Sequence, residues 1–385
     1  MTKNILIYSK KIAKASETFI IEPALALQRY QAYFVASLRR YDLAVPDERV
    51  FVANTGQGKT SLIKQSLKRR FYGNNGISAL ANKIKKVNPL LLQAHFAHEA
   101  VNALPLAQKL NIPFVIYFHG LDATIGHEAG HNNSFWQNYF DTLPGLQKSA
   151  TVVLTQSNFL RQRVIDMGFP EEKVKTQYVG IKSATQLPLS YDERKPMVLF
   201  AARLVEKKGL SYLISAMAAV QKEHPELELA VIGDGLLKDE LQKQANNDGV
   251  NCRFIGWKSH NEVLEAMREA LIFCVPSVTA ANGDSEGFGM VFIEAQRSGT
   301  PVVSTLHGGI PESVSDGKSG LLVPEKDVAG LARSIERLCT DKALWRQLSL
   351  NGYERVKTTF NLHQQVAILE TIYDKLIDSW QFPVK

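Results

Sequence analysis

The 385-residue sequence has few cysteines, no long apolar run and no apolar leader. Its cysteines are scattered and odd in number, which argues against a disulfide framework and for a reducing compartment; they are Cys252, Cys274 and Cys339. No apolar stretch approaches the roughly 18 residues that a membrane-spanning helix needs. The N-terminus, MTKNILIYSKK, leads directly into a strand pattern and is too short in apolar residues for a signal peptide. We therefore expect a cytoplasmic protein.

Acidic residues are scarce in the first half of the chain. Residues 1–185 hold 23 lysines and arginines against 12 acidic residues, whereas residues 186–385 hold 22 against 26, within a net charge of +7. A basic half can face nucleic acid, an anionic membrane surface or an anionic substrate, and it can equally be an ordinary solvated surface. The hydrophobic content of 45% suffices for a sizeable core in each half.

Short β-branched and aromatic segments alternate with amphipathic stretches along both halves. This alternation is typical of parallel sheets with helices on both faces, so we expect an α/β fold with two Rossmann-like, doubly wound domains facing across a cleft. Ligands of such domains bind at the carboxyl ends of the strands. The expected strands cover residues 4–8, 49–53, 90–96, 113–119, 150–155, 174–179, 197–201, 227–232, 251–255, 270–275 and 301–305.

A polar, proline-bearing stretch without periodicity separates the two series of strands. We expect an N-terminal domain over residues 1–183, a linker over 184–196 and a C-terminal domain over 197–361. In the tail, apolar residues recur at three- and four-residue spacing. This spacing predicts a C-terminal helix within residues 362–385, which can pack back on the N-terminal domain.

Two glycines and two glutamates surround an expected helix start in the second half. A buried strand leads into a loop ending at Gly287-Phe288-Gly289, where the glycines allow a sharp turn and close approach to a ligand. The helix that follows offers free N–H groups and a partial positive charge, which suit a phosphate. Glu294, on the second turn, is a candidate acceptor for a pair of ribose hydroxyls. Glu286 precedes the helix and can reach a sugar hydroxyl.

Two cations follow another expected strand. Arg203 and Lys208 come after the strand over residues 197–201 and before a helix, which aims both at the cleft. Together they can neutralise a diphosphate leaving group. The segment DSE over residues 284–286 is only a near match to the DxD carboxylate pair that holds a divalent metal. We therefore expect no metal or other cofactor, the cations and the helix start taking its place.

Together these motifs resemble the retaining glycosyltransferases of family 4, which have the GT-B fold. The similarity rests on the Arg…Lys pair, the two glutamates of EGFGMVFIEA and the following GTPVVSTLHGGIPESVSDGKSGLLV. It extends over nearly the whole chain and is strongest over residues 197–327. The resemblance implies a nucleotide-sugar site in the C-terminal domain and an acceptor side in the N-terminal domain. Many members of the family build exopolysaccharides or lipid-linked glycans.

The resemblance also implies a role for each matching residue of the second domain. It implies that Arg203 and Lys208 contact the diphosphate, that Glu294 binds the ribose and that the loop over residues 255–258 cradles the base. The further donor-binding positions that it implies are Gly256, Trp257, Glu286, Gly287, Phe288, Gly289 and Met290. In the loop over residues 287–289 the contacts with the donor sugar come from the backbone.

In the first domain the resemblance singles out two segments. His119, in FHGLD, stands where family members contact the donor sugar near the reacting carbon, so we count it with Arg203, Lys208 and Glu286 as catalytic. Glu17 and Thr18 belong to a SETF motif in a loop that usually lies over the donor and acceptor. The chain departs from the family in lacking the paired glycines of that loop.

Some of these residues also have a purely structural interpretation. His119 can be a strand-end histidine satisfied by its neighbours, and Glu17 and Thr18 can be helix caps. Asp122 is expected to brace the His119 loop rather than to react. Lys182 stands where the family usually has an acidic residue, and no function is assigned to it.

The resemblance implies transfer with retention at the anomeric carbon. No carboxylate stands out as a covalent nucleophile, so leaving-group stabilisation with front-face attack is favoured. We expect a UDP-hexose donor, with glucose first and GDP-mannose next, and a glycan or lipid-linked sugar as acceptor. The alternatives are a sugar-nucleotide epimerase or hydrolase on the same fold, and a non-catalytic nucleotide-sugar sensor.

Three further motifs suggest other kinds of site. The pattern H-x-x-H-E over residues 95–99 suggests a metal site, but its spacing differs from HExxH and a helix starting there would spread the ligands. ANTGQGKT, over residues 53–60, nearly satisfies a phosphate-loop pattern, but no partner for magnesium is evident. A basic amphipathic stretch over residues 59–72, followed by Lys83, Lys85 and Lys86, suits an anionic membrane surface and a lipid-linked acceptor. We expect no nucleic-acid partner.

Overall fold

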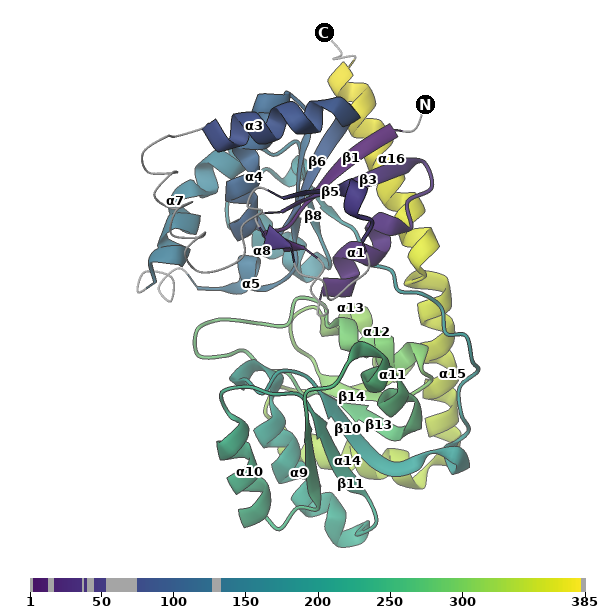
Figure 1. Ribbon diagram of the computed structural model, residues 1–385. Coiled ribbons are helices and arrows are strands. Elements are labelled where there is room, and N and C mark those ends of the chain that lie inside the picture. The colour runs from purple at the N-terminus through teal and green to yellow at the C-terminus, as the bar shows by residue number, and fades with distance from the viewer. Residues whose placement is uncertain are drawn as a thin grey trace.

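The structure, a computed structural model, describes residues 3–12, 17–36, 38–39, 45–52, 75–126 and 133–381. Two α/β domains lie one above the other, each built around a parallel sheet (Figure 1). This confirms the α/β architecture expected from the alternating pattern. The phosphate-loop-like motif over residues 53–60 and the basic stretch over residues 59–72 lie outside the described residues.

The first sheet has seven strands, paired in parallel in the order β5-β3-β1-β6-β7-β8-β9. Successive residues face opposite sides, so Ile5 and Ile7 enter one core layer and Leu6 enters the other. The strands are β1 (Lys3–Tyr8), β3 (Tyr30–Ala36), β5 (Val50–Val52), β6 (Pro89–His95), β7 (Phe114–Phe118), β8 (Val152–Thr155) and β9 (Val174–Thr176). A separate short pair is formed by β2 (Lys11–Ile12) and β4 (Leu38–Arg39).

Strand β3 was not expected from the sequence. Its residues, YQAYFVA, include only one β-branched side chain, and they follow the first helix after four residues. Pairing with β1 on one side and β5 on the other supplies the hydrogen bonds that the local sequence does not predict. β-propensity depends strongly on such sheet context.

Helices cover both faces of the first sheet. One core layer lies under α3, α4, α7 and α8, and the other lies under α1 and the C-terminal helix α16. The helices of this domain are α1 (Thr18–Leu25), α3 (Asn75–Ile84), α4 (Ala97–Leu110), α5 (Leu121–Thr124), α7 (Ser134–Ser149) and α8 (Asn158–Asp166). α16 (Leu362–Gln381) begins directly after the second domain and runs back along the first (Figure 1).

The second sheet has six parallel strands in the order β12-β11-β10-β13-β14-β15. They are β10 (Lys195–Ala201), β11 (Glu228–Ile232), β12 (Cys252–Gly256), β13 (Ala270–Cys274), β14 (Val302–Thr305) and β15 (Gly320–Val323). The helices around them are α9 (Leu210–Glu223), α10 (Lys238–Asn247), α11 (His260–Glu269), α12 (Met290–Arg297), α13 (Ile310–Ser313), α14 (Val328–Thr340) and α15 (Lys342–Thr359). β15 was not expected, because its four residues follow a glycine-bearing turn and are too few to show a pattern.

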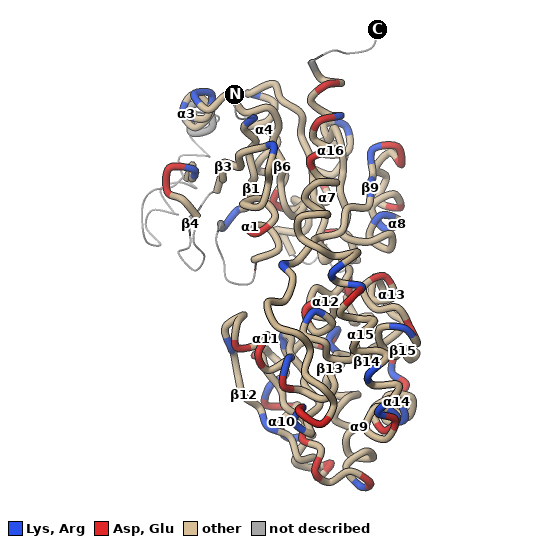
Figure 2. The backbone as a smooth tube through the Cα atoms, turned by 90° about the vertical axis from the view of Figure 1, so that its right-hand side faces the viewer, with Lys and Arg blue, Asp and Glu red and all other residues tan. Residues whose placement is uncertain are grey.

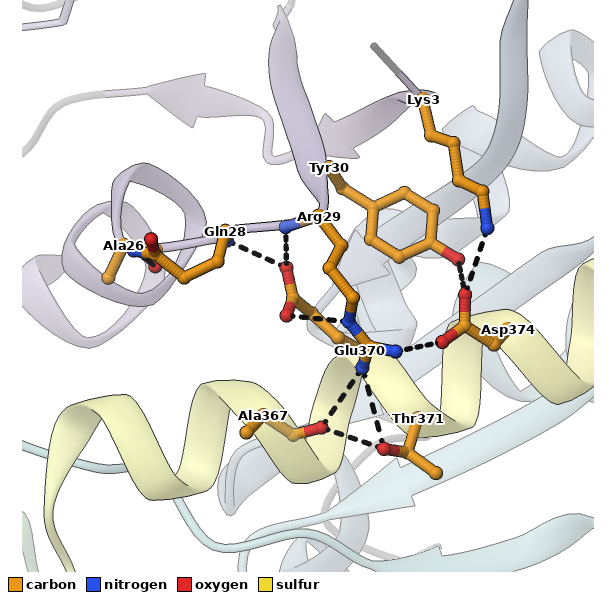
Figure 3. Close-up of polar contacts among 9 residues, drawn as sticks. All are labelled: Lys3, Ala26, Gln28, Arg29, Tyr30, Ala367, Glu370, Thr371 and Asp374. Carbon is orange, nitrogen blue, oxygen red and sulfur yellow. Dashed lines mark hydrogen bonds and ion pairs between the residues drawn. The ribbon is translucent and has the colours of Figure 1, made fainter. Parts of the chain in front are cut away.

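Helix α16 is fastened to the first domain by charged contacts (Figure 3). The Glu370 carboxylate accepts hydrogen bonds from the backbone N–H groups of Gln28 and Arg29, both at 2.7 Å, and pairs with the Arg29 side chain at 3.1 Å. One turn later, Asp374 accepts from the Tyr30 hydroxyl at 2.6 Å and also pairs with Arg29. These contacts attach the end of the chain to the loop between α1 and β3.

The chain crosses between the domains twice, and the two crossings lie side by side. Ile181 pairs with Asn361 as an isolated parallel bridge, with hydrogen bonds from Ile181 N to Phe360 O at 2.9 Å and from Leu362 N to Ile181 O at 3.0 Å. A Cβ atom on Gly180 would lie 2.6 Å from the Cα of Leu362. Glycine is therefore what allows the two crossings to touch.

The segment expected as a linker is held firmly against the second domain. The buried guanidinium of Arg194 donates to the hydroxyl of Thr300 at 2.7 Å and to the carbonyls of Ser298 and Gly299 at 3.1 and 2.9 Å. A Cβ atom on Gly299 would lie 2.2 Å from Pro188. A buried charge with several hydrogen bonds fixes geometry more than it adds stability.

Lysines and arginines are mixed with acidic residues over both domains (Figure 2). Of the basic stretch expected to meet a membrane, the structure describes only Lys83, Lys85 and Lys86, at the end of α3 and in the turn after it. All three side chains are exposed. Helix α3 lies on the part of the first domain that is farthest from the second (Figure 1). Among the described helices, none is both long enough and apolar enough to cross a bilayer.

Candidate functional site

The carboxyl ends of the strands of both sheets face the space between the domains. On the side of the second domain this space contains a cavity of about 370 Å³. Thr18 and Phe19, at the start of α1, reach it from the first domain, and Figure 1 shows this end of α1 above α12. The other lining residues come from the ends of β10, β11 and β12 and from α11 and α12: Ala201, Ala202, Arg203, Ile232, Gly233, Asp234, Trp257, Lys258, His260, Val263, Met290, Val291 and Glu294.

Five of the residues predicted from the sequence therefore share one cavity: Thr18, Arg203, Trp257, Met290 and Glu294. Arg203 is exposed, and 70% of Trp257 is accessible at the rim. Gly256 ends β12 with φ +82°, and this left-handed turn sets the direction of the following Trp257. The cavity thus offers an aromatic face, a guanidinium and a carboxyl group to one ligand.

Glu294 lies in this cavity with little access to water. Its side chain is 13% exposed, and burial raises its pKa to about 7 although Arg297 counteracts the shift. His260 Nδ1 lies 3.9 Å from its Oε1. A carboxyl group with a pKa near neutrality changes charge easily when a ligand brings hydrogen-bond donors to it.

Two lysines hold the two carboxylates of the DSE segment. The Lys208 ammonium pairs with Glu286, and both side chains are 12% exposed. Lys207 pairs with Asp284 at 2.9 Å and is more deeply buried. Burial alone would raise the pKa of Glu286, but Lys208 and Lys207 lower it to about 2, so the carboxylate stays ionised. Lys208 is therefore paired with Glu286, and neither of them lines the cavity described above.

The glycine loop packs closely against the first domain. A Cβ atom on Gly287 would lie 3.1 Å from the Cα of Gly120 and 3.2 Å from the carbonyl oxygen of His119. Ser157 of the first domain donates to the carbonyl of Gly287 at 2.5 Å. Gly289 has φ +80° at the start of α12. Glycine is thus needed here for contact between the domains as well as for the turn.

The side chain of Phe288 does not enter the cavity. It is 1% exposed and packs with Ile293, Tyr178 and Phe360 at the junction of the two domains. Contact between its backbone and a donor stays a prediction. The backbone N–H groups of Gly289 and Met290 have no acceptor within the described part of the chain.

His307, which no argument from sequence selected, orients the Glu286 loop. Its Nδ1 lies 2.7 Å from a Glu325 oxygen, so Nδ1 carries the hydrogen. Its Nε2 then accepts from the backbone N–H of Glu286 at 3.1 Å. His307 follows β14 in the LHGG motif, and the position of that motif after a strand is the signal that could have pointed to it.

His119 is brought to the cleft, but both of its ring nitrogens are engaged within the protein. Nε2 lies 2.8 Å from His95 Nδ1, and Nδ1 lies 2.5 Å from Gln156 Nε2. Burial, together with His95 and His98, holds the pKa of His119 well below its usual range, so the ring is neutral. The hydrogen bonds match the interpretation of a satisfied strand-end histidine. A donor sugar at this point would meet the ring edge or the backbone of His119.

Asp122 braces the His119 loop, as expected. Its carboxylate accepts from the backbone N–H groups of His119 and Gly120 at 3.1 and 2.9 Å, and from Ala97 at 2.8 Å. Burial raises the pKa of Asp122 to about 6 against the opposing effect of these donors. The carboxylate therefore ties the ends of β6 and β7 together.

The alternative interpretation of Glu17 as a side-chain helix cap is wrong. Glu17 is buried at the N-cap position of α1 but forms no side-chain cap hydrogen bond, and Thr18 is the first helical residue. Lys182 pairs with Glu22 of the same helix at 2.9 Å. This ion pair is exposed, and such pairs contribute little to stability.

The H-x-x-H-E segment does not converge on one point. His95 bonds to His119, His98 packs against the ring of Trp136, and Glu99 accepts from Ser9 Oγ at 3.2 Å. The expected spreading of these ligands is confirmed, because α4 begins between the two histidines. Among the described residues no group of three or more His, Cys, Asp or Glu side chains could hold a metal ion.

Glu312, on α13 of the second domain, binds the N-terminus of α8 in the first. Its carboxylate accepts from the backbone N–H groups of Asn158 and Phe159 at 2.8 and 2.9 Å, and from the Tyr178 hydroxyl at 2.9 Å. A second contact links Thr124 to Asp284 at 3.2 Å. Sequence reasoning missed Glu312 and Lys207 and assigned no partner to Asp284, since the contacts of these residues span about 80 to 150 residues of the chain.

Comparison with protein families agrees with this geometry. The model described as "Glycosyltransferase Family 4" matches residues 22–184, and the one described as "Glycosyl transferases group 1" matches residues 186–355. The chain is 32% identical over 290 residues to the amylovoran biosynthesis glycosyltransferase AmsK of Erwinia amylovora, covering 74% of this chain and 70% of that protein. It is 31% identical over 284 residues to the putative colanic acid biosynthesis glycosyltransferase WcaL of Escherichia coli K12, covering 71% and 67%.

Solved structures show the same fold at lower sequence identity. Anabaena HepE in complex with UDP and glucose superposes with a TM-score of 0.73 at 20% identity, covering 97% of this chain and 100% of that one. The sucrose-phosphate synthase of Thermosynechococcus elongatus superposes with a TM-score of 0.76 at 20% identity, covering 98% and 100%. The two facing parallel-sheet domains are thus arranged as in GT-B proteins.

Proposed function

Because this chain belongs to the glycosyltransferases of group 1 and family 4 and acts on sugar-nucleotide donors, we propose that it transfers a hexose from UDP-glucose, with retention of anomeric configuration, to a glycan or lipid-linked sugar. UDP and glucose are bound by HepE, which shares the fold. AmsK and WcaL, which share about a third of their residues with this chain over most of its length, are named for exopolysaccharide biosynthesis.

The observation that carries the proposal is the cavity at the carboxyl ends of β10, β11 and β12. It combines Trp257 for the base, Glu294 for the ribose and Arg203 for the diphosphate. The ring of Trp257 is free to stack on a base, an interaction worth roughly 1–3 kcal/mol. Glu294 and the start of α12 lie on the same helix, so one rigid element presents both the ribose site and free N–H groups.

We propose that Lys208 exchanges its partner when the donor binds. In the apo state its ammonium neutralises the ionised Glu286. A diphosphate brings two further negative charges, and the flexible lysine stem lets the ammonium reach a phosphate oxygen while Glu286 turns to a sugar hydroxyl. Arg203 and Lys208 then stabilise the leaving group without a metal.

Retention by front-face attack is the mechanism that fits the charged groups best. Glu286 is the carboxylate that the sequence motif assigns to the donor sugar. Its side chain is paired with Lys208, and its backbone N–H is bound by His307. A nucleophilic carboxylate would need freedom to attack from the opposite side of the ring. Product stereochemistry by NMR tests the retention that both routes share: an α-linked product from UDP-glucose is expected, and a β-linked product would contradict it.

Donor identity can be tested directly. A thermal-shift screen of UDP-glucose, UDP-galactose, GDP-mannose and the free nucleotides should give the largest stabilisation with the UDP sugars, because a ligand that binds only the native state raises Tm. Any donor that binds is then assayed for hydrolysis without acceptor. Stabilisation by GDP-mannose alone would contradict the choice of donor and leave the family unaffected.

The same assays separate the alternatives. A sugar-nucleotide hydrolase would release free sugar at the full rate without an acceptor, and an epimerase would convert one nucleotide sugar into another. A sensor would bind the donor and leave it intact. A transferase should hydrolyse its donor slowly and turn over faster once a glycan acceptor is present.

We propose in addition that the basic stretch over residues 59–72, together with the three lysines after it, contacts an anionic membrane that carries a lipid-linked acceptor. It holds Lys59, Lys64, Lys68, Arg69, Arg70, Lys83, Lys85 and Lys86. Each basic residue near such a surface contributes about 1 kcal/mol, screened by salt. Flotation with liposomes containing anionic lipid should recover the protein at low salt, and equal recovery with neutral liposomes would contradict the proposal.

A further inference from the structure

A buried chain of polar side chains runs from the C-terminal helix to the cleft. The Tyr373 hydroxyl on α16 lies 2.8 Å from Gln93 Oε1, and Gln93 Nε2 lies 3.0 Å from His95 Nε2. His95 Nδ1 lies 2.8 Å from His119 Nε2, whose Nδ1 lies 2.5 Å from Gln156. Gln93, His95, His119 and Gln156 come from the neighbouring strands β6, β7 and β8 and the residues just after them, so the chain follows the edge of the sheet at the cleft.

The two hydrogen-bonded imidazoles are nearly coplanar and meet edge to edge. Their ring centroids are 5.0 Å apart with an interplanar angle of 15°, and the ring of Tyr117 packs near both, with centroids at 5.5 and 4.6 Å. His95 is 3% exposed. The residue after it, Phe96, has φ +63° and ψ +114°, a backbone conformation that a bulky residue rarely adopts. Its ring lies 4.7 Å from that of His119.

The chemistry of the chain allows only two arrangements of hydrogens on neutral rings. A neutral imidazole has one N–H and one acceptor nitrogen. If Gln93 donates to His95 Nε2, then His95 Nδ1–H donates to His119 Nε2, and His119 Nδ1–H must meet the Gln156 carbonyl oxygen. If Gln156 instead donates to His119 Nδ1, every bond reverses and Gln93 presents its oxygen to His95. In both arrangements the two histidines are the same tautomer.

We propose that His95 is a positioning residue for sugar transfer, which holds His119 in one neutral tautomer and one ring orientation beside the donor. The inference rests on the proposed function, with the donor sugar beside His119 as the family resemblance implies. A charged His119 would repel the positive charge that develops on the sugar as the leaving group departs, so a ring that cannot take up a proton protects turnover. The role of Tyr373 is to fix the Gln93 end of the chain from α16.

The surroundings of the pair support a neutral state. Within the described residues, Tyr117 contacts both rings and Asp122 on α5 binds the backbone of His119, while His98 on α4 acts on His119 through its charge. Burial lowers the pKa of His95 to about 3, and burial lowers that of His119 too. His98 is not a member of the hydrogen-bonded chain from Tyr373 to Gln156, so a change at His98 leaves the bonds of that chain in place.

The tautomers can be measured on the wild-type enzyme without a substrate. With ¹⁵N-labelled histidine, NMR should show His95 and His119 with the hydrogen on the same ring nitrogen, and neither ring should titrate between about pH 5 and 8. Opposite tautomers, or titration of either ring in that range, would overturn the proposal. This readout does not depend on the choice of donor, so it fails or succeeds separately from the proposed function.

The matched variants are His95→Phe and His98→Phe. The first keeps a ring against Tyr117 and removes the hydrogen bond to His119, whereas the second replaces a neighbouring histidine outside the chain. Each variant removes one imidazole that lowers the pKa of His119, but only His95→Phe also removes the hydrogen bond that orients its ring. The kcat of His95→Phe should therefore lie about tenfold below that of His98→Phe at both pH 6 and pH 8, with KM for the donor changed by less than about twofold. A kcat for His95→Phe that equals that of His98→Phe at both pH values would overturn the proposal. Should His95→Phe fail to fold, Gln93→Leu breaks the next bond of the chain and should shift the ¹⁵N signals of both rings.

Discussion

The carboxylate of Glu312 in the second domain accepts a hydrogen bond from the backbone N–H of Asn158, the first residue of α8 in the first domain, at 2.8 Å. The carboxylate lies at the positive end of the helix, where charge and hydrogen bonding both favour it. It also binds Phe159 and the Tyr178 hydroxyl. One side chain thus caps a helix of the other domain and holds the two domains in contact.

Glu312→Ala should therefore weaken closure of the cleft more than the fold of either domain. Loss of a helix cap costs about 0.5–2 kcal/mol. We expect kcat/KM for the donor to fall by about three- to thirtyfold, and small-angle scattering of the apo enzyme to show a larger radius of gyration.

The control for this variant is Asp341→Ala. Asp341 caps α15 within the second domain by accepting from Leu344 N at 2.9 Å. It should lower Tm by a similar amount and leave kcat/KM near the wild-type value. Equal kinetic losses in both variants would show that Glu312 acts on stability alone.

Lys208→Ala should chiefly lower turnover. It removes a cation from the proposed leaving-group site and leaves the ionised Glu286 without its main partner. Removing one group that stabilises transition-state charge costs about 10²–10³ in kcat. Lys195, an exposed lysine that pairs with Glu269 at 2.6 Å, gives the matched control Lys195→Ala, for which we expect unchanged kcat. Steady-state kinetics with saturating donor decides, and wild-type turnover in Lys208→Ala would refute the assignment.

Glu294 should make donor binding depend on pH near neutrality. Burial raises its pKa to about 7, and ribose hydroxyls donate best to the ionised form, so donor affinity should rise between about pH 6 and 8. Isothermal titration with UDP-glucose, whose diphosphate does not titrate in this range, should show this rise in the wild type and a flat profile in Glu294→Gln. Glu294→Ala should weaken binding at every pH. A slope that persists in Glu294→Gln would assign the titration to another group.

The same group has a consequence for stability. The folded-state pKa of Glu294 lies above that of an ordinary glutamate, so the folded state binds the proton more tightly. Its contribution to the free energy of unfolding is fully present below about pH 4.5 and is lost as pH rises towards 7. Urea titrations should therefore show that Glu294→Gln gains stability relative to the wild type at pH 8 and not at pH 4.

Chelation of divalent metals should leave transfer activity intact. Both carboxylates of the DSE segment are held by lysines, with Lys207 bound to Asp284 and Lys208 to Glu286. An ammonium group in that position competes with a divalent cation for the same oxygens. Dialysis against EDTA should change the initial rate by less than about twofold. Loss of activity that added Mg²⁺ or Mn²⁺ restores would contradict the metal-free proposal.

Much of the fold follows from local patterns in the sequence. Strands β1, β6, β7, β8, β10, β11 and β13 are short apolar runs that end near glycine or polar residues, and each was expected within a few residues. The turn at Gly287 and Gly289 and the helix after it were expected for the same reason. Strand β3 and strand β15 were not, because their stability comes from neighbours in the sheet rather than from their own residues.

The same distinction between local pattern and tertiary contact applies to the candidate site. Arg203, Trp257 and Glu294 follow strands or lie on the helix after the glycine loop, and the topology of a parallel sheet brings such positions to one edge. Their partners could not be anticipated. Lys208 meets Glu286 across 78 residues of sequence, and His119 meets His95 and Gln156, which engage both of its ring nitrogens.

The sequence by itself determined the class of this protein: two α/β domains, a glycine loop before a helix, and cations and carboxylates at strand ends. These features depend on residues close together in the chain, whose spacing fixes periodicity and turns. Only the tertiary structure decided which charges are paired, what the ring nitrogens of His119 bond to and which carboxylate caps a helix of the other domain. Those properties depend on distances of about 3 Å between segments far apart in sequence, and packing alone sets such distances.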